Sequence, residues 1–232
     1  MMSPRCQRRK GLEGKVEMAM DDNARAWQQM AKLLRPRLPG EWTQGRSGIR
    51  TVLVRQPVEW VLTWVGAVRS RRSNNPTIWV AQTPLVSEWR GGLALGHGVT
   101  SDRPGPGQID FTRPDAAEVV ERFVLDAGLP RVSWSARDFA AEAEEQYAQP
   151  HAERGRPLVC IDAAAWRVIL ETGSPVEPAL EAAAWLEDTA MASDEGAWHR
   201  ALVDAWNSGG RAAAMTFLTT NRDAAVASLK LR

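Results

Sequence analysis

Hydrophobic and polar residues alternate along one stretch in the first half of the chain. Between residues 58 and 68 the apolar residues fall mainly on even positions, whereas Glu59 and Thr63 occupy odd ones. The apolar residues at even positions are Val58, Trp60, Leu62, Trp64 and Val68. A period of two is typical of a β-strand with one face against a core. We therefore predict a strand here, with Trp60 and Trp64 facing the main core.

Other short segments with a strand-like pattern lie on both sides of this run. Turn-rich connections such as Gln56-Pro57 and Asn74-Asn75-Pro76 separate them, and no helical period intervenes. The predicted strands cover residues 50–55, 58–68, 77–83, 92–99 and 108–111. Successive strands joined by short connections favour an antiparallel meander.

A helical period of three to four residues replaces the alternation before and after these strands. The first predicted helix runs from residue 22 to residue 38, where Pro39-Gly40 ends it. After the strands, Thr112 is predicted to cap a helix that Gly128 ends, and Ser135 to cap the next. Further helices are predicted over residues 162–172, 177–190, 194–207 and 211–232, the last with a break near Asn221.

These elements predict an α+β fold in which an N-terminal helix and an antiparallel sheet of about five strands, covered by helices, precede a small all-α C-terminal segment. We expect an α+β domain over residues 20–148, a linker over 149–157 and the helical segment over 158–232. Residues 1–19 contain Cys6 and five basic residues but no apolar period, which indicates a disordered leader or an over-called start.

Composition is typical of a globular protein, with 44% apolar and 25% charged residues in 232. Eleven tryptophans make the chain tryptophan-rich. No apolar run approaches the ~20 residues that span a bilayer, and no apolar region of a secretory signal follows the first basic residues. We therefore expect a cytoplasmic protein. Only Lys10, Lys15, Lys32 and Lys230 of the 29 basic residues are lysine, a bias that indicates a GC-rich bacterial genome.

Charge is distributed unevenly between the two halves of the chain. Residues 1–113 carry 18 basic and 9 acidic side chains, whereas residues 114–232 carry 11 and 19, although the whole chain has a net charge of only +1. Such asymmetry is found in proteins that bind nucleic acid. It is equally compatible with two halves that attract each other or with a solvated acidic surface.

His97 is the best-placed candidate for a catalytic residue. It lies in a predicted strand between two glycines, and Asp110 on the next predicted strand could orient it as a general base. The alternative is a buried structural histidine with a hydrogen-bonded ring nitrogen. No nucleophile-elbow motif accompanies His97, so the case for an enzyme depends on this residue.

Binding motifs are few. Arg69, Arg71 and Arg72 form a basic cluster in a predicted hairpin loop, which could contact an acidic partner or a nucleic-acid backbone or could simply be solvated. His151 and His199 stand far apart, and Cys160 is interpreted as a small buried residue. With neither metal-ligand spacing nor a phosphate-binding loop, we predict no metal and no cofactor.

Three classes of function therefore remain open. The first is a non-catalytic module that binds another protein, as regulatory, immunity-type or defence-associated bacterial proteins do. The second is a hydrolase- or transferase-like enzyme that uses His97. The third is a nucleic-acid-binding protein that uses the basic N-terminal half. The sequence identifies neither the partner nor the oligomeric state.

Overall fold

The computed structural model describes residues 22–47, 50–69, 76–87, 93, 97–101, 109–111, 113–149, 158–188 and 193–231. The predicted leader, loop residues Arg71 and Arg72, and nearly all of the predicted linker lie outside these residues. No helix in the described part of the chain is long and apolar enough to cross a membrane.

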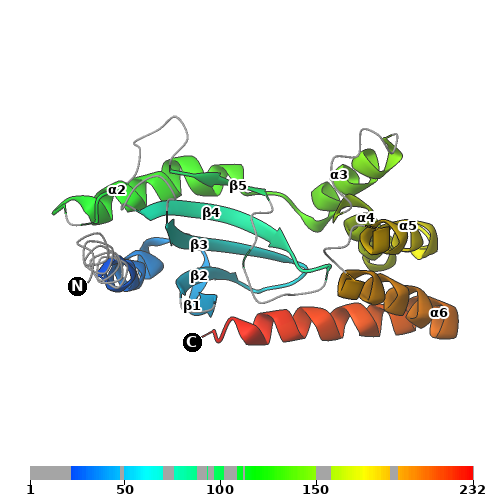
Figure 1. Ribbon diagram of the computed structural model, residues 1–232. Helices are drawn as coiled ribbons and strands as arrows, with labels where there is room; N and C mark the ends of the chain where they lie inside the picture. Colours follow the sequence, from blue (N-terminus) through cyan, green and yellow to red (C-terminus); the bar gives the residue numbers. More distant parts are fainter. Residues whose placement is uncertain are drawn as a thin grey trace, which may run out of the picture.

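An antiparallel sheet forms the centre of the protein (Figure 1). Its strand order is β1-β2-β3-β4-β5, so each strand pairs with its neighbour in the sequence and the predicted meander is confirmed. The strands are β1 (Glu41–Ser47), β2 (Arg50–Gln56), β3 (Val61–Arg69), β4 (Pro76–Pro84) and β5 (His97–Thr100).

The prediction and the structure differ in the first strand of the sheet and in the last predicted strand. β1 was not predicted, because its sequence is mostly polar and Trp42 and Gly45 are its buried residues. Residues 109–110, predicted as part of a strand, have no regular secondary structure, and Phe111 lies in a turn. Five strands were correctly expected, but one of them was placed in the wrong segment.

Helices surround this sheet. The first helix covers residues 22–34 and continues as a short 3-10 turn, η1 (Arg35–Arg37). The others are α2 (Ala116–Arg122), the π-helical η2 (Phe123–Gly128), the 3-10 turn η3 (Leu129–Arg131), α3 (Ala136–Ala148), α4 (Leu158–Leu170), α5 (Val176–Asp188) and α6 (Ser193–Ser228). The structure thus confirms the α+β class.

Both faces of the sheet are buried, which the alternation alone did not predict. On one face Leu53, Val65 and Val80 pack against the first helix and η2, in a cluster that we call the N-terminal core. On the other face Trp64 packs with Val54 against the end of α6, in the C-terminal core. The side chains at the odd positions of β3 therefore lie in an apolar core, as those at the even positions do.

Trp60 does not share the environment of Trp64. It precedes β3, is half-buried, and packs against a third cluster, the helical core, which α3 to α6 build at one end of the sheet. The guanidinium of Arg222 lies 4.8 Å from the centre of its ring. The prediction that both tryptophans face one core is therefore correct for Trp64 and wrong for Trp60.

Two of the predicted helix boundaries depend on local chemistry that the structure displays. Ser135 caps α3: its Oγ accepts a hydrogen bond from the amide of Asp138 at 3.3 Å, and its own amide donates to the Asp138 carboxylate at 2.7 Å. The Ser135 hydroxyl also donates to this carboxylate at 2.7 Å, and this bond, together with the one from the Ser135 amide, lowers the pKa of Asp138. Gly128 ends η2, where an added Cβ would lie 2.5 Å from Val80. Glycine lets this helix approach the sheet.

α6 runs from Ser193 to Ser228 with a kink between the two helices predicted over residues 194–207 and 211–232, which confirms that separation. The predicted break near Asn221 is absent. The Asn221 side chain instead bridges two groups, accepting from Trp198 Nε1 at 3.1 Å and donating to the carbonyl of Phe217 at 2.9 Å. Gly209 and Gly210 have non-helical angles and produce a kink.

Candidate functional site

His97 lies on β5 opposite Gln82 of β4. His97 is half-buried, less than the structural alternative requires, and Nε2 is 2.9 Å from the carbonyl oxygen of Arg131. A carbonyl only accepts, so Nε2 carries the hydrogen of this bond. The imidazole stacks on Trp134 with ring centres 4.0 Å apart and an interplanar angle of 18°.

Gln82 fixes the backbone of Trp134 beneath this ring. Its side chain is buried, donates to the Trp134 carbonyl at 2.9 Å and accepts from the Trp134 amide at 3.0 Å. The nitrogen of the Gln82 side chain also lies 3.3 Å from the hydroxyl of Thr63. Gln82 was not predicted as a site residue, although a glutamine inside an apolar strand indicates a buried amide that needs partners.

The aromatic contacts continue from His97 into the helical core. Trp134 meets Phe139 of α3 edge-on at 5.2 Å, and Phe139 stacks on Trp166 of α4 at 6.5 Å. Asp110 is not among the contacts of His97 in the described part of the chain; its carbonyl accepts from the amide of Arg113. The geometry thus gives His97 a packing role between the sheet and α3, and does not bring the proposed acid–base pair together by a hydrogen bond.

Replacing His97 by asparagine should lower the free energy of unfolding by about 1–2 kcal/mol, because the change removes one hydrogen bond and one ring stack. Urea denaturation followed by tryptophan fluorescence measures this loss. His97→Phe keeps the stacking and removes only the bond, so it should lose less. An unchanged free energy of unfolding in His97→Asn would show that the hydrogen bond and the ring stack of His97 do not stabilise the fold.

A second histidine, His199 of α6, lies inside the helical core near Trp198. It is 2% exposed, and its Nδ1 has no hydrogen-bond partner among the described residues. Burial lowers its pKa to about 4. The burial of His199 could have been predicted from the sequence, because the spacing of Trp198, Leu202 and Val203 places it on an apolar helix face. Among the described residues, no group of three or more His, Cys, Asp or Glu could hold a metal ion.

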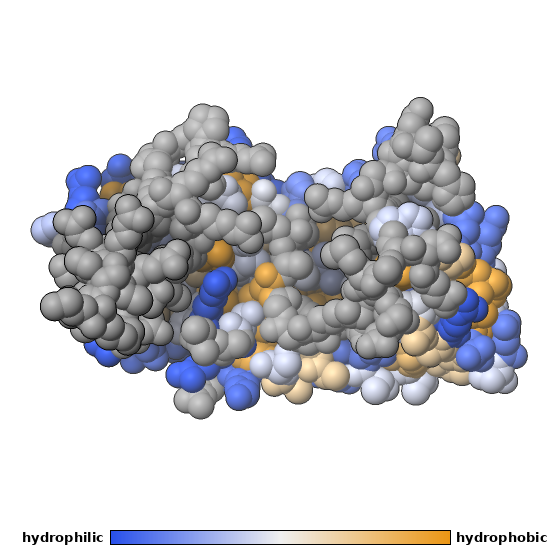
Figure 2. All heavy atoms as spheres, in the orientation of Figure 1, coloured by the Kyte–Doolittle hydropathy of each residue, from blue (hydrophilic) through white to orange (hydrophobic). Residues whose placement is uncertain are grey.

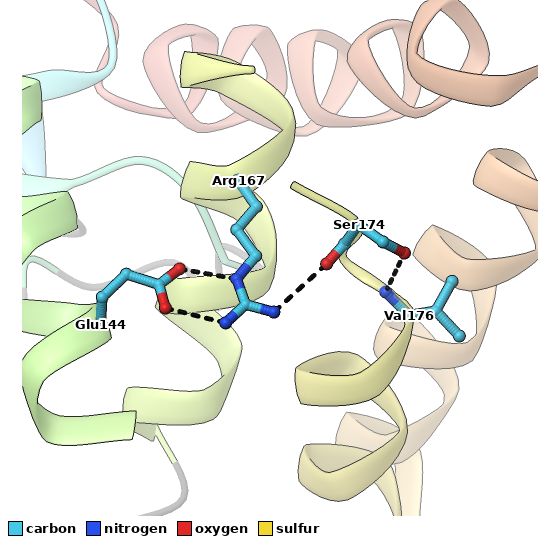
Figure 3. A network of polar contacts seen from close by, with 4 residues as sticks. All are labelled: Glu144, Arg167, Ser174 and Val176. Carbon is cyan, nitrogen blue, oxygen red and sulfur yellow. Dashed lines mark hydrogen bonds and ion pairs between the residues drawn. The ribbon is translucent and has the colours of Figure 1, made fainter. Parts of the chain in front are cut away.

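A bidentate ion pair joins α3 and α4 (Figure 3). Arg167 Nε and Nη2 donate to the Glu144 carboxylate at 2.6 and 2.8 Å, and Nη1 reaches the carbonyl of Ser174 at 3.4 Å. The guanidinium also lies 5.1 Å from the centre of the Tyr147 ring. The hydrogen bond to Glu144 raises the pKa of Arg167. These contacts indicate a structural clamp between α3, α4 and the turn before α5.

The predicted basic cluster is only partly within the described residues. Arg69 is the last residue of β3 and stands opposite Pro76 of β4. Arg71 and Arg72 belong to the connection between these strands, which the structure does not describe. The cluster therefore stays a prediction.

Large apolar side chains reach the surface on α5. Leu180 is 42% exposed and Trp185 is 46% exposed, and Ala184 between them is exposed too. We call these three residues the α5 face. The opposite side of the helix buries Ala179, Ala182, Ala183 and Leu186. Hydrophobic side chains are visible at the surface on the side of the molecule where α5 lies (Figure 2).

The sequence of α5 is acidic. It contains Glu177, Glu181, Glu187 and Asp188 and has no basic residue. A solvated acidic surface is one of the interpretations of the C-terminal half given above, and the exposed apolar residues of α5 were not predicted.

Comparison of the chain with protein-family models, curated proteins and solved structures found no match.

Proposed function

We propose that the protein is a non-catalytic interaction module that binds another protein through the α5 face. A regulatory, immunity-type or defence-associated role in a bacterial cell is compatible with such binding. The observation that carries the proposal is the exposure of Leu180 and Trp185 on one helix.

The arrangement of residues on α5 supports this proposal. A helix at a protein surface normally turns its large apolar residues toward the core. Here Leu186 and three alanines occupy the buried side, while the larger Leu180 and Trp185 remain 42% and 46% exposed. Tryptophan is among the residues most often found at the energetic centre of protein interfaces.

Charge suggests the character of the partner. The exposed Glu177 precedes Leu180 by about one helical turn, and the half-buried Glu181 precedes Trp185 by about one turn. A basic surface with an apolar centre would therefore complement this helix. The contacts of His97 with Arg131 and Trp134 do not favour the enzyme alternative.

The proposal is tested by isolating a binding protein from the native cell after chemical cross-linking and measuring its affinity in purified form. Trp185→Ala should weaken binding about 30-fold or more, the effect of removing a central interface residue. Leu33→Ala is the matched control, because Leu33 is 59% exposed on the first helix. Equal affinities of the two variants would contradict the proposal.

A further inference from the structure

The C-terminal end of the chain lies against the outer edge of the sheet. β1 is the first strand of the sheet, and α6 ends beside it (Figure 1). The amide of Arg46 in β1 donates to the carbonyl of Leu229 at 2.6 Å. Leu229 is fully buried in the C-terminal core, so this contact is anchored on the sheet. We call residues 229–231 the tail.

Gly45 makes this close approach of the tail possible. A Cβ at this position would lie 2.7 Å from the Leu231 side chain and 2.8 Å from the carbonyl oxygen of Leu229. Backbone cannot yield to a side chain as a flexible neighbour can. Any larger residue at position 45 therefore requires the tail to move.

The backbone of the tail turns where α6 ends. Lys230 has a φ of +47°, in the left-handed region that a lysine seldom occupies. Its amide donates to the carbonyl of Ala227 at 3.1 Å and closes the last helical turn, where a left-handed residue commonly ends a helix. The bond from Arg46 and the burial of Leu229 fix the tail on β1.

The remaining backbone groups on this edge have the geometry for pairing with another strand. Because the Arg46 amide points away from β2, the period of two directs the backbone groups of Gln44 and Trp42 outward as well. Unpaired strand edges are templates for further strands, and proteins commonly cover them.

We propose that the outer edge of β1 is a docking site for β1 of a second copy of this chain, and that the tail covers this site. The two strands would pair antiparallel about a two-fold axis at Gln44. Trp42 of each copy would then stand opposite Arg46 of the other. The tail and the second copy compete for the Arg46 amide, so only one of them can occupy it.

The charges along β1 are compatible with this self-pairing. In the proposed register Glu41 stands opposite Ser47 and Thr43 opposite Gly45, so no two like charges face each other. The exposed Arg46 of each copy stands opposite Trp42, whose indole stays buried in its own core, so the guanidinium keeps its contact with solvent. In the full chain the tail has the advantage, because an attached segment acts at a high effective concentration.

The test displaces the tail without removing any residue. Gly45→Val should move the tail and convert a monomer into a dimer at ~100 µM in sedimentation velocity, a range in which modest interfaces are populated. In this background Gln44→Cys should form an intermolecular disulfide, because hydrogen-bonded residues on paired strands lie about 5.5 Å apart. Arg50→Cys on β2 is the matched control, and the full chain with Gln44→Cys alone should not cross-link.

A folded, monomeric Gly45→Val protein would overturn the proposal. If Gly45→Val does not fold, judged by circular dichroism, the chain ending at Ser228 takes its place and should be dimeric. A monomeric or unfolded chain ending at Ser228 would also overturn the proposal, since a second copy should replace the tail. A dimer that cross-links equally at positions 44 and 50 would place the interface elsewhere.

Discussion

Replacing Trp64 by alanine is expected to lower the free energy of unfolding by about 3–5 kcal/mol, the range for truncating a large buried aromatic residue. Its side chain is 2% exposed and packs in the C-terminal core beside Trp79, with ring centres 6.1 Å apart. Its indole nitrogen also donates to the Thr83 hydroxyl at 2.9 Å. The change removes this bond and leaves a cavity between the sheet and α6. Such a loss is a large part of the stability of a typical domain.

Thr63→Ala provides the control on the opposite face of the same strand. Thr63 is also buried, but it contributes a weak 3.3 Å contact to Gln82, whose side chain keeps its bonds to Trp134. Its loss should be about 1 kcal/mol or less. Chemical denaturation of both variants measures the difference. Equal losses would contradict the assignment of Trp64 to a packed core.

The second large effect concerns pH. His199 has a pKa of about 4 in the folded protein, because burial disfavours the charged imidazolium. The unfolded chain has the ordinary pKa of about 6.5 and binds more protons between these values. Stability should therefore fall as the pH drops from about 6.5 to about 4, by about 3 kcal/mol in all from this group.

His199→Leu isolates this contribution from those of the carboxylates. The variant has no titrating group at position 199 and no unpaired Nδ1, so it should be less sensitive to acid than the natural chain. The measurement is the free energy of unfolding of both proteins from about pH 4 to about pH 7.5, a range that includes both pKa values of the histidine. If the difference between them does not vary with pH, His199 is not buried as a neutral group.

Alternation and helical period predicted the class of the fold because they report which side of an element is buried. They did not reveal that the sheet is covered on both faces. Val65 and Ile78 lie in the N-terminal core, but single apolar residues also occur on the exposed face of a strand that buries only its other face, so they did not indicate a second core. β1 was not predicted because a strand at the edge of the sheet needs few apolar residues. The helix break near Asn221 was wrong because its side chain finds partners within the helical segment.

The candidate site was less predictable. The exposure of Leu180 and Trp185 depends on how α5 is rotated against α4 and α6, and the sequence around them contains enough apolar residues for either side to face inward. His97 was identified from the sequence, but its partner Arg131 lies on a distant turn. The contact between the tail and β1 joins segments far apart in the chain, which no local pattern indicates.

Site-specific photo-cross-linking in the native cell tests the proposed binding role of the α5 face most directly. A photoreactive amino acid at position 180 should give a discrete adduct with another protein, and the cross-linked segment should contain basic and apolar residues. The same group at position 33 should give no such adduct. Absence of an adduct at position 180, or the same adduct at both positions, would contradict the account.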